Sequence, residues 1–136
     1  MDKQRVVEAL NQALGEELAL LTQTYWHYVM ATGAASPALR ERWREMSIRD
    51  MRHAEELAER IDHYGGIPTT QPRQVQVGGD LTQMIRDDVA LKRESVKMYA
   101  GYLDLVKDEP ITYHLLLEIL KEEESDLDEL ESWLSE

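Results

Sequence analysis

The chain has 136 residues, with 27 aspartates and glutamates against 15 lysines and arginines, and it has no cysteine. A net charge of −12 without a local basic patch argues against a nucleic-acid surface, and the lack of cysteine excludes a disulfide scaffold or a thiolate metal site. The length suits one domain, residues 1–136, and no apolar run approaches the ~18 residues of a membrane span. The first residues lack the apolar segment of a signal peptide, so we expect a cytoplasmic protein.

Apolar residues recur at helical spacing in four segments, which predicts an all-α protein. The expected helices cover about residues 2–32, 37–64, 80–107 and 110–134. Ser36 is expected to cap the second helix and Asp80 the third, because such side chains accept a hydrogen bond from the first turn. Gly65 and Gly66 should end the second helix.

Residues 65–79 read GGIPTTQPRQVQVGG and interrupt the helical period. Their glycines, prolines and alternating valines favour an extended connection. About fifteen extended residues reach up to ~50 Å, more than the ~40 Å length of a ~27-residue helix. The second and third helices can therefore run parallel, as in a four-helix bundle with one long crossover.

A few polar residues fall on the apolar stripes of these helices. They are Glu17 in the first helix, Asp50 and His53 in the second, Lys92 in the third, and Glu123 and Asp126 in the fourth. Burying such groups without partners is costly, and a carboxylate three residues before a histidine is half of the metal-binding pattern of helix-bundle carboxylate proteins. Glu16 falls about 100° around the helix from Glu17, so we expect it to be solvated.

Carboxylates together with an imidazole suit a hard divalent cation, which favours iron, with manganese or zinc as alternatives at the same site. If the four acids are ionised they carry four negative charges, of which Lys92 removes one. Such an excess in a bundle core requires a cation, bound protons or water. Our hypothesis is that the Lys92 ammonium stands in for a second metal ion. One strong metal site then remains at Glu17, Asp50, His53 and Glu123, with Asp126 as a further candidate ligand.

Each feature also has a purely structural interpretation. A single acid such as Glu17 is common at a bundle edge, and Lys92 taken alone is more typical of a salt bridge than of catalysis. The joint occurrence of acids and an imidazole on three helices favours the metal site. Other polar and aromatic residues are assigned outside the site. His27, His63 and His114 are predicted to lie at the surface or an interface, Asp88 to one side of the core face of the third helix, and Trp43 at a subunit contact.

Five stretches carry a resemblance to a known family. They are LNQALGEELALLTQ (10–23), IRDMRHAEELAERI (48–61), GGIPTTQP (65–72), IRDDVALKRE (85–94) and LEILKEEESDLDELESWL (117–134). Through them the chain resembles the ferritin-like proteins, and bacterioferritins most closely, over nearly its whole length. The resemblance implies a ferritin-like four-helix bundle that binds ferrous iron and takes part in its oxidation or storage.

The resemblance also implies roles for individual residues. Glu17 matches the first-helix iron ligand, Asp50 and Glu123 match the bridging glutamates, and His53 matches the histidine beside the first of these. Lys92 stands where the family has its third-helix glutamate, and Asp126 where it has its second histidine. One half of a di-iron site is thus kept and the other altered, so ferroxidase activity, which couples two ferrous ions to oxygen or peroxide, is expected to be weak or lost.

Met51 matches the methionine that holds haem between two subunits in bacterioferritins, although a methionine at a helix interface is more often plain packing. It lies about 100° around the helix from Asp50 and so should face outward. The family also implies a homo-oligomer, at least a dimer. The sequence ends at Glu136, before the short fifth helix of typical bacterioferritins, so an assembly other than a closed shell is an alternative. The alternative function is a non-catalytic ferritin-like dimer or interaction protein, with or without bound haem, whose relic metal site is held by Lys92.

Overall fold

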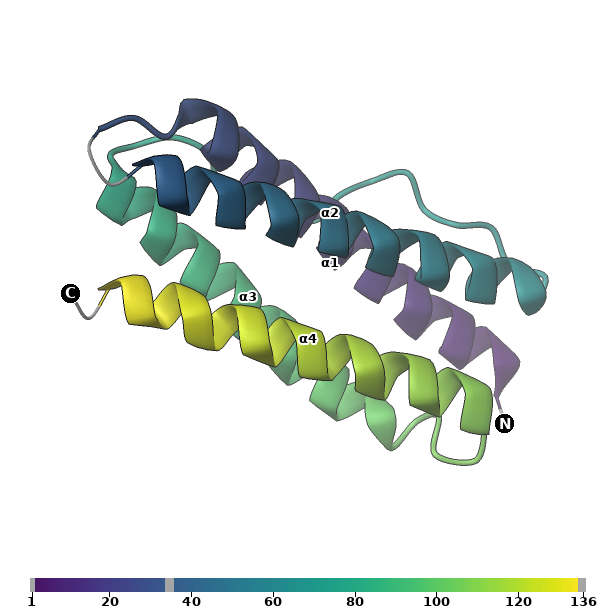
Figure 1. Cartoon of the computed structure of the whole chain (residues 1–136). Helices are drawn as coiled ribbons and strands as arrows, with labels where there is room; N and C mark the ends of the chain where they lie inside the picture. Colours follow the sequence, from purple (N-terminus) through teal and green to yellow (C-terminus); the bar gives the residue numbers. More distant parts are fainter. Residues whose placement is uncertain (1, 34–35, 135–136) are drawn as a thin grey trace.

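Four helices account for most of the computed structural model, which describes residues 2–33 and 36–134 (Figure 1). They are α1 (Lys3–Met30), α2 (Ser36–His63), α3 (Leu81–Leu103) and α4 (Pro110–Leu134). No strand occurs among the described residues, and the prediction of an all-α fold is confirmed. The two ends of the predicted domain, residue 1 and residues 135–136, lie outside the described part of the chain.

The helix ends follow local hydrogen bonding. The Asp80 side chain accepts from the Gln83 backbone N–H at 2.8 Å, which confirms its capping role. The prediction for Ser36 is wrong, because Ser36 is already the first helical residue and its buried hydroxyl has no partner among the described residues. Helix α3 ends at Leu103 and not near residue 107, because the chain turns tightly there, with the Val106 N–H donating to the Leu103 carbonyl.

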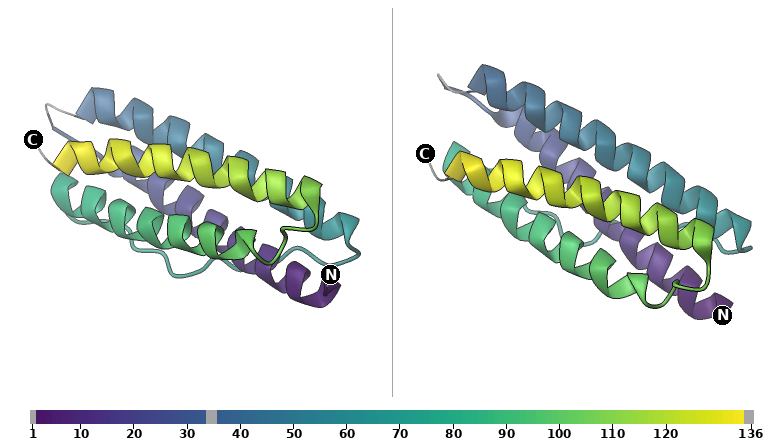
Figure 2. Two further views of the ribbon diagram at one scale, coloured as in Figure 1. Left: turned by 90° about the horizontal axis from the view of Figure 1, so that it is seen from below. Right: turned by 60° about the horizontal axis from the view of Figure 1, so that its bottom comes forward.

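The helices form one bundle in which α1 runs antiparallel to α2 and α3 antiparallel to α4, while α2 and α3 run in the same direction (Figures 1 and 2). The crossover between α2 and α3 makes this possible, since it returns along the outside of the bundle, as the sequence predicted. Among the helices of the described residues, none has an apolar stretch of the length that a membrane crossing needs.

The crossover is fastened to α1 by both side chains and backbone. The Asn11 amide donates to the Ile67 carbonyl at 3.0 Å and accepts from the Thr69 N–H at 2.8 Å. Farther along, the Arg73 N–H donates to the Gly15 carbonyl at 3.0 Å. A side chain at Gly15 would press on the crossover, because a Cβ there would lie 3.2 Å from the Gln71 carbonyl oxygen.

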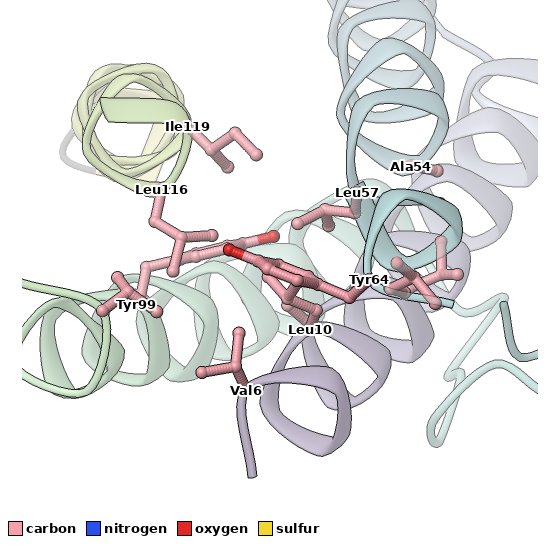
Figure 3. Close-up of a cluster of buried hydrophobic side chains, with 12 residues drawn as sticks. Val6, Leu10, Ala54, Leu57, Tyr64, Tyr99, Leu116 and Ile119 are labelled. Carbon is pink, nitrogen blue, oxygen red and sulfur yellow. The ribbon is translucent and has the colours of Figure 1, made fainter. Parts of the chain in front are cut away.

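Two large apolar clusters fill the bundle, one toward each end, and a smaller third cluster consists of Ala19, Leu20 and Leu91. Figure 3 shows the first, in which Tyr64 and Tyr99 enter from opposite sides among aliphatic residues. The second cluster includes Trp43, which is fully buried, so its prediction as a subunit-contact residue is wrong. The polar residues predicted to form the metal site lie between the segments of their helices that form the two large clusters. The fold therefore places a polar layer, formed by these site residues, between the two large apolar clusters.

Candidate metal centre

The polar layer receives side chains from all four helices. Glu17 comes from α1, Asp50 and His53 from α2, Lys92 from α3, and Glu123 from α4, and all five are fully buried. Each lies on the stripe of its helix that also carries core residues, so the same helical period that buries the aliphatic side chains turns these groups inward.

Four of these residues offer ligand atoms within 4.8 Å of one another: Glu17, Asp50, His53 and Glu123. The imidazole is their hub. Its Nδ1 lies 2.9 Å from Glu123 Oε1, 3.3 Å from Glu17 Oε1 and 3.6 Å from Asp50 Oδ1. Three carboxylates and one imidazole nitrogen converging at this distance form a donor set that fits a divalent cation such as Fe²⁺ or Mn²⁺.

Lys92 lies beside this group as a hydrogen-bond donor. Its Nζ lies 3.0 and 3.2 Å from the two Asp50 oxygens and 2.7 Å from Glu123 Oε2. Asp126 Oδ2 is 3.5 Å away. The ammonium thus binds the two carboxylates that the family resemblance assigns as bridges between metal ions.

The structure keeps Asp126, also predicted as a ligand, apart from the four converging residues. Asp126 is 1% exposed, and its Oδ1 accepts from Arg49 Nη1 at 2.5 Å. Sequence reasoning did not identify Arg49. Its position directly before Asp50 on α2 gave no sign that its side chain would reach across to α4.

Two further residues contact the four converging residues and were not predicted from the sequence. The Tyr99 hydroxyl donates to Glu17 Oε2 at 2.6 Å, and His53 Nε2 lies 3.0 Å from Glu122 Oε1. Tyr99 follows Lys92 by two helical turns, so its phase was a usable signal. Glu122 had no such signal, because its contact with His53 depends on the distance between α2 and α4, which neither helix sequence specifies.

The pKa values reflect these contacts. Burial raises the pKa of Glu17, and the charges of Glu123 and Asp50 raise it further. Burial, together with the Glu123 charge, raises the pKa of Asp50 to about 7 although Lys92 opposes the shift. Burial opposes charging of His53, but its hydrogen bonds to Asp50, Glu123 and Glu17 raise its pKa to about 12. Burial also opposes charging of Glu123, yet Lys92 and His53 hold its pKa well below the usual range.

The charge balance differs from the sequence-based estimate, which counted Lys92 as the only cation. The structure adds the Arg49 guanidinium on Asp126, and the raised pKa of His53 favours a protonated imidazole as the third cation. Four carboxylates then face three cations, and a proton on Glu17 would remove the remaining negative charge. The layer can therefore be close to neutral without metal, because bound protons can balance its charge. Proton uptake was one of the alternatives predicted from the sequence.

A second buried polar cluster lies one helical turn from Lys92, at Asp88. This carboxylate accepts from Gln23 Nε2 at 2.8 Å and Trp43 Nε1 at 2.7 Å, and His27 Nδ1 lies 3.0 Å away. All of these side chains are buried, so the predictions of a surface His27 and a side-on Asp88 are wrong. His63 and His114 are exposed, as expected.

Glu16 is another correction, since it is buried where solvation was predicted. The crossover covers this side of α1, and Arg73 Nε lies 3.3 Å from Glu16 Oε2. Burial raises the pKa of Glu16, while the Arg73 charge opposes the shift.

Met51 faces away from the polar layer, as predicted, and is 58% exposed. It lines an apolar groove of about 430 Å³ between α1 and α2. The other main lining residues are Leu21, Tyr25, Trp26, Arg44 and Ile48.

Comparisons with known proteins agree with the fold and with the resemblance read from the sequence. A protein-family model described as a ferritin-like domain matches residues 7–136. The chain is 32% identical over 133 residues to a bacterioferritin of Mycobacterium leprae. The aligned region covers 96% of this chain and 84% of that protein.

Solved structures superpose closely on the chain. A bacterioferritin of Desulfovibrio desulfuricans, described with its diiron site in different catalytic states, matches with a TM-score of 0.91 and 29% identity. The match covers 98% of this chain and 80% of that one. A bacterioferritin of Rhodobacter capsulatus, described with a metal-free dinuclear site and haem iron, matches with a TM-score of 0.88 and 24% identity over 97% and 84% of the two chains, which supports the fold.

Proposed function

The chain belongs to the ferritin-like family, and from that premise we propose that it is a cytoplasmic iron-handling protein that binds one ferrous ion per chain. The proposed ligands are the four converging residues Glu17, Asp50, His53 and Glu123. The observation that carries the proposal is the Lys92 ammonium, which lies within hydrogen-bond distance of both Asp50 and Glu123 where a second ion would need them. Manganese and zinc fit the same donor set.

The surrounding residues would orient the ligands. The Nδ1 atom of His53 faces the buried carboxylates, and its Nε2 atom faces Glu122. An imidazole that loses the Nδ1 proton to bind a metal can therefore still donate from Nε2 to Glu122. Tyr99 fixes Glu17 through its hydroxyl. A bound iron supplies one-electron redox chemistry, whereas Lys92 keeps its hydrogen bonds and holds the place of the partner ion. We therefore expect iron binding with slow ferrous oxidation.

A second candidate function is favoured by a different observation, the exposed Met51 in its apolar groove. The family resemblance implies that such a methionine can hold haem between two copies of the chain. In that case the protein is a non-catalytic, haem-binding dimer, and the polar layer persists as a set of salt bridges around Lys92.

Metal analysis of the purified chain after anaerobic ferrous loading, with a mass measurement of the assembly, tests the first proposal. We expect one iron per chain, and a His53→Ala variant, which removes the central ligand, should bind little. Two tightly held ions per chain would overturn the stand-in role of Lys92. No bound iron would favour the second candidate.

Oxidation and haem binding are then separable. Air added to the iron-loaded protein should raise the near-ultraviolet absorbance slowly, and faster in a variant that combines Lys92→Glu with Asp126→His. A Soret band after haem addition that is lost in Met51→Leu would establish the haem role, whereas a band unaffected by that substitution would exclude Met51 as its ligand.

A further inference from the structure

The side of the polar layer that the proposed iron does not use is closed by a surface arginine. Asp126 is the buried carboxylate on that side, and Arg49 Nη1 binds its Oδ1. The Asp126 Oδ2 atom makes no hydrogen bond within the described residues and faces Lys92 Nζ at 3.5 Å. Asp126 is therefore shared between two cationic side chains and is not free to coordinate a metal.

Arg49 reaches this position from the seam between α2 and α4. Its side chain is 30% exposed, so the guanidinium spans from solvent to the buried carboxylate, and its Nε lies 3.6 Å from Glu122 Oε2. Arg52, the next arginine along the seam, binds Glu122 and Glu56 and makes no ion pair with Asp126 among the described residues. The two arginines thus share an environment and differ in whether they contact the polar layer.

Lys92 and Arg49 together bring the charge of one divalent ion to the carboxylates of Asp50, Glu123 and Asp126. With one iron bound, a neutral His53 and four ionised acids, the charges of the layer would cancel. We propose that Arg49 sets the metal stoichiometry of the centre, because it competes with a second divalent cation for Asp126 while Lys92 occupies the bridging carboxylates. This inference rests on the proposed function, whose metal site it extends.

Cobalt(II) titration followed by visible absorbance and metal analysis tests the inference. Lys92→Glu supplies a carboxylate at the altered third-helix position but leaves Arg49 on Asp126, so its second cobalt should bind weakly. In the double variant Lys92→Glu/Arg49→Gln, the second cobalt should bind at least about tenfold more tightly than in Lys92→Glu, because Asp126 is released and a nearby positive charge is removed. The matched control, Lys92→Glu/Arg52→Gln, should resemble Lys92→Glu.

Equal second-ion affinities in Lys92→Glu with and without Arg49 would overturn the inference, and so would an equal gain from Arg52→Gln. The single variant Arg49→Gln provides a test that leaves Lys92 and the core ligands intact. It should bind its one cobalt about threefold or more tightly than the natural chain, since a positive charge has been removed; unchanged affinity would contradict the proposal. A natural chain that binds no cobalt would instead overturn the proposed function, while the comparison of the Lys92→Glu variants would still decide the role of Arg49.

Discussion

At the scale of single residues, the side chains that are proposed to bind the metal hold protons more tightly than they would in an unfolded chain. The pKa values of Glu17, Asp50 and His53 all lie above those of an unfolded chain. Such groups stabilise the metal-free fold fully below the unfolded pKa, and this contribution is lost as the pH rises through the folded pKa. For Asp50 the loss is complete near pH 7, and for His53 it extends from 6.5 towards about 12. Glu123, whose pKa is lowered, loses its contribution only in acid.

We therefore expect the metal-free protein to melt at lower temperature as the pH is raised from about 5.5 to 8.5. A divalent ion binds the deprotonated ligands, so the rise in melting temperature produced by excess cobalt should grow over the same range. Differential scanning calorimetry with and without cobalt measures both trends. His53→Asn should flatten them, because it removes the imidazole whose pKa is raised to about 12. A cobalt effect that shrinks with rising pH would contradict the assignment.

Single residues also show where sequence reasoning reached its limit. Glu17, Asp50, His53 and Glu123 could be placed at the centre because each is in phase with core residues of its own helix. His27 was misplaced because its partner, Asp88, lies on another helix, and the pairing depends on how α1 and α3 are docked. A period describes which face of a helix is buried, but it does not say which side chains of other helices meet that face.

At the scale of elements, the crossover allows α2 and α3 to run parallel, and Asn11 holds it against α1 through two hydrogen bonds. Replacing Asn11 with alanine removes both its donor and its acceptor, leaving the Ile67 carbonyl and the Thr69 N–H to water. We expect a loss of about 1–2 kcal/mol in the free energy of unfolding, measured by urea denaturation. Trypsin should also cleave after Arg73 more rapidly, since the segment is less firmly held.

Asn11→Asp is the matched control, because it keeps an oxygen that accepts from the Thr69 N–H and replaces the donating amide nitrogen with a carboxylate oxygen. Its loss of stability and its cleavage rate should lie between those of the natural chain and Asn11→Ala. Equal cleavage rates in all three proteins would show that Asn11 does not hold the crossover.

Element boundaries were predictable where a capping group or glycine marks them, as at Asp80 and Gly65. The end of α3 was not, because Val106 remains buried although the helix has stopped at Leu103. Its apolar side chain continued the helical pattern into a turn. Glu16 was misjudged for a related reason, since the crossover buries a second face of α1 that the apolar stripe does not mark.

At the scale of the whole molecule, an apolar face stands out on a strongly acidic protein. Trp26 and Ile48 are each 47% exposed, and with Met51 they lie along the groove between α1 and α2. Exposed apolar groups gathered in this way are typical of subunit interfaces. A chain with a net charge of −12 repels its copies, so association through this face should strengthen when salt screens that repulsion.

We predict that the protein forms a homodimer through this face and that Ile48→Glu converts it to monomers, because the substitution places two like charges in an apolar contact. Sedimentation velocity at low and high salt measures the assembly. The control is Ile111→Glu, which adds the same charge at a residue that is 68% exposed and lines a different groove, between α2 and α4. The dimer should survive Ile111→Glu and be lost in Ile48→Glu. The reverse result would place the interface on the α2–α4 side. It would also remove the argument for haem at Met51, because a haem held between two copies requires that the copies meet where Met51 is exposed.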